Sequence, residues 1–198
     1  LDGGRKLQNE GIFNWTGGSL IYLGQNPTGT SVGGATIINA LGATFNDAVA
    51  GTINNGSGTN AFINAGTFQT SFASGTTTIA VTFNNTGSVQ VGAGGTLNLT
   101  AGGTETGTFS IASGATLELN SAVTFDGASS TGLGELRLAS STLSRRSTSL
   151  APGSRVVTEY LEFFAVAAAI SIEKAVLHRE MLEKHRIEQQ LSIAREVQ

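Results

Sequence analysis

The chain has 198 residues, of which 39% are hydrophobic and only 13% are charged, a composition sufficient for a buried core. Its net charge of −3 argues against nucleic acid and anionic membranes as partners, because it creates only a weak field. The absence of cysteine excludes a disulfide framework and a thiolate metal site. Glycine dominates the chain up to about residue 135 and charged residues dominate after Leu143, which indicates two unlike parts.

The first part contains a repeat of about 20 residues, which is visible when Asn85–Thr104 is aligned with Glu105–Thr124. Identical residues occupy matched positions at Thr86 and Thr106, Gly87 and Gly107, Gly94 and Gly114, and Leu97 and Leu117. Each period holds two short alternating apolar segments that follow a glycine, a pattern typical of stacked solenoid coils. We therefore expect residues 1–142 to form an all-β parallel β-solenoid (β-helix) with about 20 residues per coil.

The alternation within each repeat predicts which side chains face the core. In a strand, successive side chains point to opposite faces, so Leu97 and Leu117 should point inward and Asn98 outward. Neighbouring coils should then supply each other's core, because one coil cannot bury its own apolar face.

Looser copies of the repeat lie upstream and place asparagines at Asn39, Asn64 and Asn85. The longer interval between Asn39 and Asn64 predicts an insertion that bulges out as a loop over Gly51–Gly58. Two explanations are open for the repeated asparagines. The favoured one is a turn residue that tolerates left-handed backbone angles, and the other is a row of amide hydrogen bonds from coil to coil.

The phrase FNNTGSVQVGAGGTLNLTAGGTETGTFSIASGATLEL resembles the repeats of bacterial surface proteins of the filamentous-haemagglutinin and autotransporter-passenger kind. The resemblance covers residues 7–138. It implies a parallel β-helix that acts as an adhesin or as a stalk, located at the cell surface or outside the cell. It carries no binding residues over to this chain.

A linker over residues 143–154 and a long amphipathic helix over residues 155–198 are predicted next. Apolar residues such as Val157, Leu161 and Phe164 recur there at steps of three and four, and no glycine follows Gly153. The narrow apolar seam near its end favours a coiled coil, so a helix-mediated homodimer is expected. The longest apolar stretch, Phe163–Ile172, is too short to span a bilayer.

Residues 152–198 also resemble a known join, on the sequence FAVAAAISIEKAVLHREMLEKHRIEQQLSIAREVQ. This stretch is similar to the last helix of a GAF domain followed by the signalling helix that precedes a SpoIIE-type serine phosphatase. The resemblance implies a cytoplasmic regulatory segment, with the metal-binding aspartates of that family beyond Gln198. Neither phosphatase activity nor ligand binding is carried over.

The sequence offers weak candidates for chemistry, and none is adopted. His178 and His185 are seven residues apart, whereas a metal pair on a helix normally uses a spacing of four. The clusters Gly56–Gly58 and Gly92–Gly95 lack the Lys and Ser or Thr of a phosphate-binding loop, so they are interpreted as turns. Glu105 and Asp126 are spaced to lie about one coil apart, which leaves a paired-carboxylate site as a minor hypothesis.

We therefore expect a protein that is not an enzyme, with no catalytic residues, no cofactor and no metal. The leading hypothesis is a structural or interaction segment of a bacterial surface protein that contacts a host surface or glycan through the solenoid. Its secretion signal would lie upstream of Leu1. The alternatives are a regulatory fragment of a GAF-linked phosphatase and an artificial or mispredicted fusion of two unrelated parts.

Overall fold

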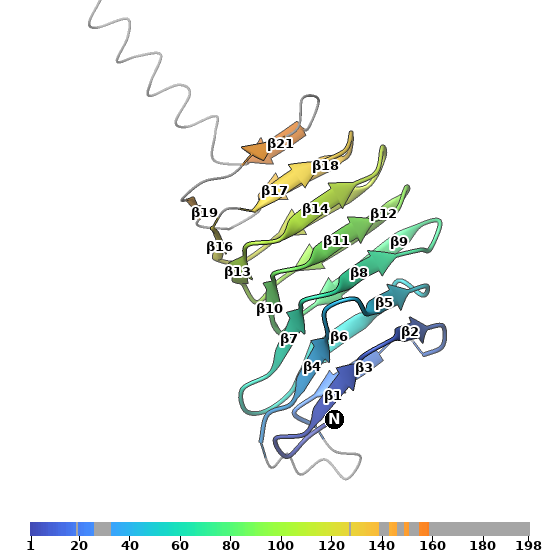
Figure 1. Cartoon of the computed structure of the whole chain (residues 1–198), viewed down its shortest axis with the longest axis vertical. Helices are drawn as coiled ribbons and strands as arrows, with labels where there is room; N and C mark the ends of the chain where they lie inside the picture. The colour runs from blue at the N-terminus through green and yellow to red at the C-terminus, as the bar shows by residue number, and fades with distance from the viewer. Residues whose placement is uncertain are drawn as a thin grey trace, which may run out of the picture. The chain divides into compact units, whose positions relative to one another are not determined.

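The structure is a computed structural model that describes residues 1–18, 20–25, 33–126 and 128–138, together with the strands at residues 143–145, 149–150 and 155–158. Contacts divide the chain into two units, Leu1–Val157 and Thr158–Gln198. The first unit is a parallel β-solenoid, in which every third strand along the chain joins the same sheet (Figure 1). The predicted fold class of this part is confirmed.

Three seven-stranded sheets form the walls of the solenoid. Sheet A contains β1 (Lys6–Asn9), β4 (Thr36–Asn39), β7 (Ala61–Asn64), β10 (Thr82–Asn85), β13 (Gly103–Glu105), β16 (Val123–Phe125) and β19 (Leu143–Arg145). Sheet B contains β2 (Ile12–Trp15), β5 (Thr44–Asp47), β8 (Thr67–Thr70), β11 (Ser88–Val91), β14 (Thr108–Ile111), β17 (Ser129–Thr131) and β20 (Ser149–Leu150). Sheet C contains β3 (Leu20–Leu23), β6 (Thr52–Asn55), β9 (Gly75–Ile79), β12 (Gly95–Leu99), β15 (Thr116–Leu119), β18 (Glu135–Leu138) and β21 (Arg155–Thr158).

The strand register confirms the repeat length of about 20 residues. Ser88 pairs with Thr108 and Thr96 pairs with Thr116, each 20 residues later. The sequence analysis found only two strands per period, at β11 and β12. It missed the sheet A strand because Gly103–Glu105 carries no alternation of apolar residues.

The core runs through the interior of the coils and consists of inward side chains from all three sheets. Leu97 and Leu117 are fully buried, whereas Asn98 between two inward leucines is only half-buried. The predicted inward and outward faces are therefore confirmed. Phenylalanine rings also pack from coil to coil, with Phe45 stacked on Phe13 at 4.7 Å and on Phe68 at 5.6 Å between ring centroids.

The predicted insertion is placed differently in the structure. Thr52–Asn55, expected in the Gly51–Gly58 loop, forms strand β6 and pairs with β3 and β9. The extra residues follow this strand, at residues 56–60 before β7. The error has a physical reason: Ile53 is inward and fully buried, so this polar segment still supplies an apolar side chain to the core.

The predicted boundary near Leu143 is also wrong, because the segment expected as a linker over residues 143–154 contains strands β19 and β20. Arg155–Thr158, expected to open the helix, forms β21 beside β18 in sheet C. Its two adjacent valines suit a strand as well as a helix, and an edge of sheet C is open to receive them. The helix predicted over residues 159–198 lies outside the described residues.

Substitutions on the two faces of β12 and β15 test the fold. Leu97→Asp and Leu117→Asp should each lower the free energy of unfolding by more than about 5 kcal/mol, since each removes a buried leucine and buries a carboxylate. Asn98→Lys should cost less than about 1 kcal/mol, because its side chain lies on the outer face opposite Glu118. Denaturant unfolding measures all three, and equal losses would contradict the assigned faces.

Candidate functional site

The most ordered polar feature of the interior is a ladder of asparagine side chains at the inner end of sheet A. Asn9 Nδ2 donates to Asn39 Oδ1 at 2.8 Å, Asn39 Nδ2 to Asn64 Oδ1 at 2.7 Å, and Asn64 Nδ2 to Asn85 Oδ1 at 2.8 Å. The last three side chains are fully buried. We call these four residues the amide ladder.

Each ladder amide also ties its coil to the start of the next coil's sheet B strand. The second donation runs from Asn39 Nδ2 to the Thr67 carbonyl at 2.9 Å, and from Asn64 Nδ2 to the Ser88 carbonyl at 3.0 Å. Both N–H groups of each amide are therefore used inside the protein, which removes the cost of burying them. The ladder thus holds the corner between sheets A and B in register from coil to coil.

This corner is tight enough to require glycine. A Cβ on Gly87 would lie 2.1 Å from the Gly66 carbonyl oxygen, and a Cβ on Gly107 would lie 2.1 Å from the Gly87 carbonyl oxygen. Both distances are too short for a carbon atom, so the chain turns directly over the backbone of the preceding coil. The repeated Asn-x-Gly spacing serves this corner.

The favoured explanation of the repeated asparagines was wrong. Among the described residues, Ala50 is the one non-glycine residue with a positive φ, so no ladder asparagine adopts the left-handed backbone. The coil-to-coil hydrogen bonds that stood as the alternative are present instead. The sequence signal was the register itself, because residues one coil apart in a parallel sheet lie directly side by side.

The ladder ends at Glu105, which follows Asn85 in the register of β10 and β13. Glu105 is fully buried, and neither of its carboxyl oxygens nor the Asn85 Nδ2 atom has a hydrogen-bond partner. Burial alone raises the pKa of the Glu105 carboxyl well above its usual value. The carboxyl is therefore a local weak point in the stack.

Glu105 and Asp126 do not form the paired-carboxylate site considered from the sequence. The Asp126 N–H donates to the Glu105 carbonyl at 2.9 Å, so the two backbones are neighbours. Their side chains differ, however, because Glu105 is fully buried and Asp126 is exposed. One carboxyl faces the core and the other faces solvent, which rules out a shared substrate.

A second buried carboxyl, Asp47 on β5, is accommodated by hydrogen bonds. The Thr77 hydroxyl donates to Asp47 Oδ2, and the Val49 N–H donates to Asp47 Oδ1 at 3.0 Å. Burial raises the pKa of Asp47, and the hydrogen bonds from Thr77, Val49 and Ala50 oppose that rise. The arrangement links β5 to β9 and presents no group to solvent.

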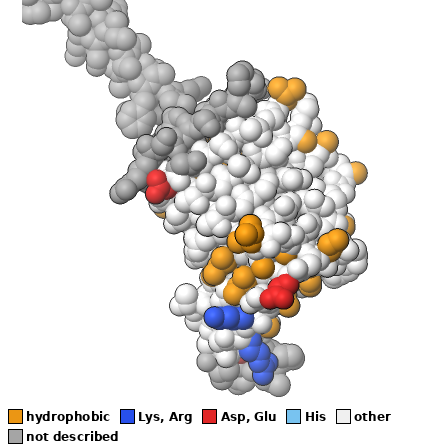
Figure 2. Space-filling model, in the orientation of Figure 1, with side chains coloured by type: hydrophobic (Ala, Val, Ile, Leu, Met, Phe, Trp, Pro, Cys, Tyr) orange, Lys and Arg blue, Asp and Glu red, His pale blue; other side chains and the backbone are white. Residues whose placement is uncertain are grey.

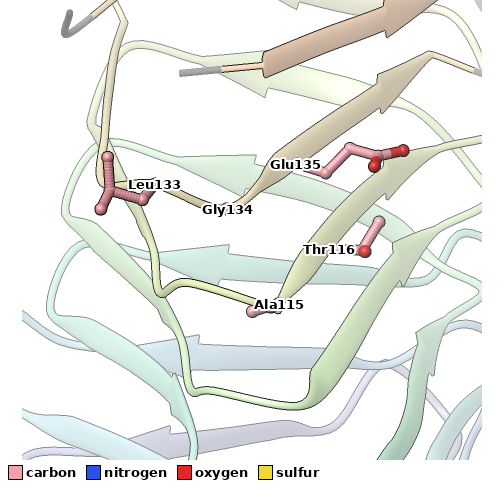
Figure 3. Close-up of a pocket in the computed structure, with 6 residues that line it drawn as sticks. Ala115, Thr116, Leu133, Gly134 and Glu135 are labelled. Atoms are coloured by element: carbon pink, nitrogen blue, oxygen red, sulfur yellow. The ribbon is translucent and has the colours of Figure 1, made fainter. Parts of the chain in front are cut away.

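A surface pocket of about 230 Å³ lies where the turn before β18 stacks on the turn before β15 (Figure 3). Its six lining residues are Gly114, Ala115, Thr116, Leu133, Gly134 and Glu135. Glu135 is the single titratable side chain among them, and in Figure 3 it points away from Leu133. General acid and base chemistry needs a second positioned group, so the pocket supports no acid–base pair.

The glycine clusters occupy the turns expected from the sequence. Gly92–Gly95 spans the turn between β11 and β12, with Gly94 at a φ of 78°, and Gly56–Gly58 lies in the loop after β6. His178 and His185 lie outside the described residues. Within the described part, no three His, Asp or Glu side chains gather as potential metal ligands. Nor does that part contain a helix with the length and apolarity that a membrane crossing requires.

The outer face of sheet B carries neutral polar side chains in columns along the solenoid. One column runs through Asn14, Asn46, Gln69, Gln90, Ser110 and Thr131. Its first members form an external amide row, in which Asn46 Nδ2 donates to Asn14 Oδ1 and Gln69 Nε2 donates to Asn46 Oδ1, each at 3.1 Å. Figure 2 likewise shows that most of the visible face of the solenoid has neither acidic nor basic side chains.

No family model, no curated protein and no solved structure matches the chain. Function is therefore argued from the geometry of the solenoid.

Breaking the buried ladder should cost far more than breaking the external row. Asn64→Ala removes the acceptor of Asn39 and the donor to Asn85 in the core, so we expect a loss of about 2–4 kcal/mol in the free energy of unfolding. Asn46→Ala is the matched control, since it also removes two side-chain amide bonds but at the surface, and should cost less than about 1 kcal/mol. Thermal and denaturant unfolding compare them, and similar losses would show that the ladder contributes nothing special.

Glu105 should make the solenoid more stable in acid than at neutral pH. An unfolded glutamate titrates at about pH 4.3, whereas the folded carboxyl holds its proton to a higher pH. The stability of the neutral carboxyl is thus complete below pH 4.3 and is lost as the pH rises through the folded-state pKa.

Glu105→Gln should therefore raise the free energy of unfolding at pH 7, with a gain that shrinks toward pH 4. The glutamine cannot ionise, and its carbonyl offers an acceptor beside the unpartnered Asn85 amide. Denaturant unfolding across this pH range measures the difference between variant and wild type. A gain that does not depend on pH would show that ionisation of Glu105 is not the cause.

Proposed function

We propose that the chain is a non-enzymatic structural and interaction segment of a bacterial surface protein, of the adhesin or stalk kind. The observation that carries the proposal is how the interior polar groups are used. The amide ladder donates its N–H groups from each coil to the next, along the same direction as the parallel strand pairing. Such an interior builds a spacer that can be lengthened coil by coil.

The division of labour between inside and outside supports the same proposal. Inward side chains are constrained by contacts with both neighbouring coils, whereas the outer columns are not needed for the core. Thr108, Ser110 and Thr131 on sheet B are exposed hydroxyl residues on adjacent coils. Hydroxyl and amide groups in such columns suit hydrogen bonding to a neutral polysaccharide or to a host surface rich in sugars.

The weak net charge fits a contact of this kind better than an electrostatic one. A charge of −3 over 198 residues attracts neither polyanions nor polycations strongly. Binding through the solenoid would then be weak for each coil and would grow with the number of coils in contact. The proposal therefore places affinity in repetition along the face of sheet B.

A surface-display experiment tests the adhesin role. The full chain is displayed on bacterial cells, and the cells are allowed to settle on films of neutral polysaccharides and on cultured host cells. The displayed chain should increase retention several-fold on at least one of these surfaces. A variant with Gln90→Lys and Ser110→Lys should lose that gain, because two exposed charges would interrupt the neutral column.

Asn98→Lys with Thr78→Lys is the matched control, because it adds the same charge to the outer face of sheet C and should keep the gain. Retention equal to that of cells without the chain on every film would contradict an adhesive role. Equal losses in both double variants would contradict the assignment to sheet B.

A further inference from the structure

The first coil of the solenoid has an open edge. Strands β1, β2 and β3 are the terminal strands of sheets A, B and C, so each has a neighbour on one side only. Their inward side chains Leu7, Phe13 and Ile21 are half-buried, whereas the corresponding Ile37, Phe45 and Ile53 in the next coil are fully buried. The cross-section of the core is therefore uncovered at this edge, which we call the N-terminal edge.

The amide ladder is also incomplete at the N-terminal edge. Asn85 Oδ1 accepts from Asn64 Nδ2 at 2.8 Å and from the Gly87 N–H of its own turn at 3.2 Å. Asn9 Oδ1 has the equivalent turn contact with the Gly11 N–H at 3.2 Å. The other donor, an amide from a preceding coil, has its place free at Asn9.

The backbone of Leu1 shows how a preceding coil would arrive. The Leu1 nitrogen donates to the Tyr22 carbonyl at 2.8 Å, and the Gly24 N–H donates to the Leu1 carbonyl at 2.7 Å. These two bonds are the pattern of parallel pairing between Leu1 and Leu23. Leu1 thus already occupies the position of a sheet C strand one coil before β3.

We propose that the N-terminal edge binds one further solenoid coil, which runs parallel to β1, β2 and β3 and continues directly into Leu1. This coil carries an amide side chain over Asn9 and large apolar side chains over Leu7, Phe13 and Ile21. The inference goes beyond the proposed surface role, since it holds for any function of the solenoid.

The opposite end of the solenoid does not supply the matching coil. The register of sheet A places Glu105, Phe125 and Arg145 in the ladder column of the later coils, so that end offers no asparagine in this column. A second copy stacked end to end would therefore leave the acceptor of Asn9 without its amide. Coils with the pattern of β7, β8 and β9 do match, because they carry Asn64 at the ladder position and Phe68 in the column of Phe13.

The register also shows how to build the missing coil. Leu20 pairs with Thr52 and Thr52 pairs with Thr78, which puts Val81 in the row of Leu23 and hence of Leu1. A copy of residues 61–80 fused directly before Leu1 therefore places Leu1 where Val81 follows Ala80. The copied Asn64 then falls in the ladder column and the copied Phe62 and Phe68 fall over the open core.

Hydrogen exchange tests the proposal on this extended full chain. The amides of Lys6, Gln8, Ile12, Asn14, Leu20 and Tyr22 face the N-terminal edge, because the alternate residues bond to the second coil. Their exchange should slow at least tenfold in the extended chain, and the midpoint of thermal unfolding should rise. The matched control is the same extension with both copied phenylalanines replaced by aspartate, which should leave exchange at these six amides unchanged.

Exchange in β10, β11 and β12 reports that each variant remains folded. Equal exchange at the six amides in the two extended chains would overturn the proposal. Protection of the same amides in the unextended chain that rises with protein concentration would also overturn it, since copies would then cover the edge instead.

Discussion

Parallel pairing of each coil with the next is the interaction on which the rest of the structure depends. A coil of about 20 residues has three strands of three to five residues, too few to bury an apolar face without neighbours. The core exists because columns of side chains from successive coils touch one another. Phe45, for example, lies against Phe13, Phe62 and Phe68, which come from three different strands.

Polar groups are accepted in this core when they follow the same coil-to-coil direction. Asn39 and Asn64 are buried at little cost because their amides repeat at the spacing of the strands and bond to one another. Asp47 departs from the repeat but is compensated by Thr77 and by the Val49 backbone. Glu105 departs from it without compensation, so the stack carries an unsatisfied carboxyl at the point where the asparagines stop.

The same dependence on neighbours explains why the outside and the ends of the solenoid differ from its middle. An outer side chain such as Gln90 can change without disturbing the core, which leaves the faces available for contacts with other molecules. An end coil instead lacks one of the two neighbours that its inward residues need. The half-buried Phe13 and the free acceptor of Asn9 are two expressions of that single deficit.

The repeat in the sequence was sufficient to predict the parallel β-solenoid, the coil length and the inward positions of Leu97 and Leu117. These features follow from local periodicity, because alternation within a strand and recurrence at a fixed interval are both written along the chain. The amide ladder, the third strand of each coil and the continuation of the solenoid through Arg155–Thr158 were decided only by the tertiary structure. A short strand such as Gly103–Glu105 becomes a strand because β10 lies beside it, and Asn64 becomes a ladder residue because Asn39 and Asn85 lie one coil away on either side. Such contacts depend on the neighbouring coils, which one segment of sequence does not contain.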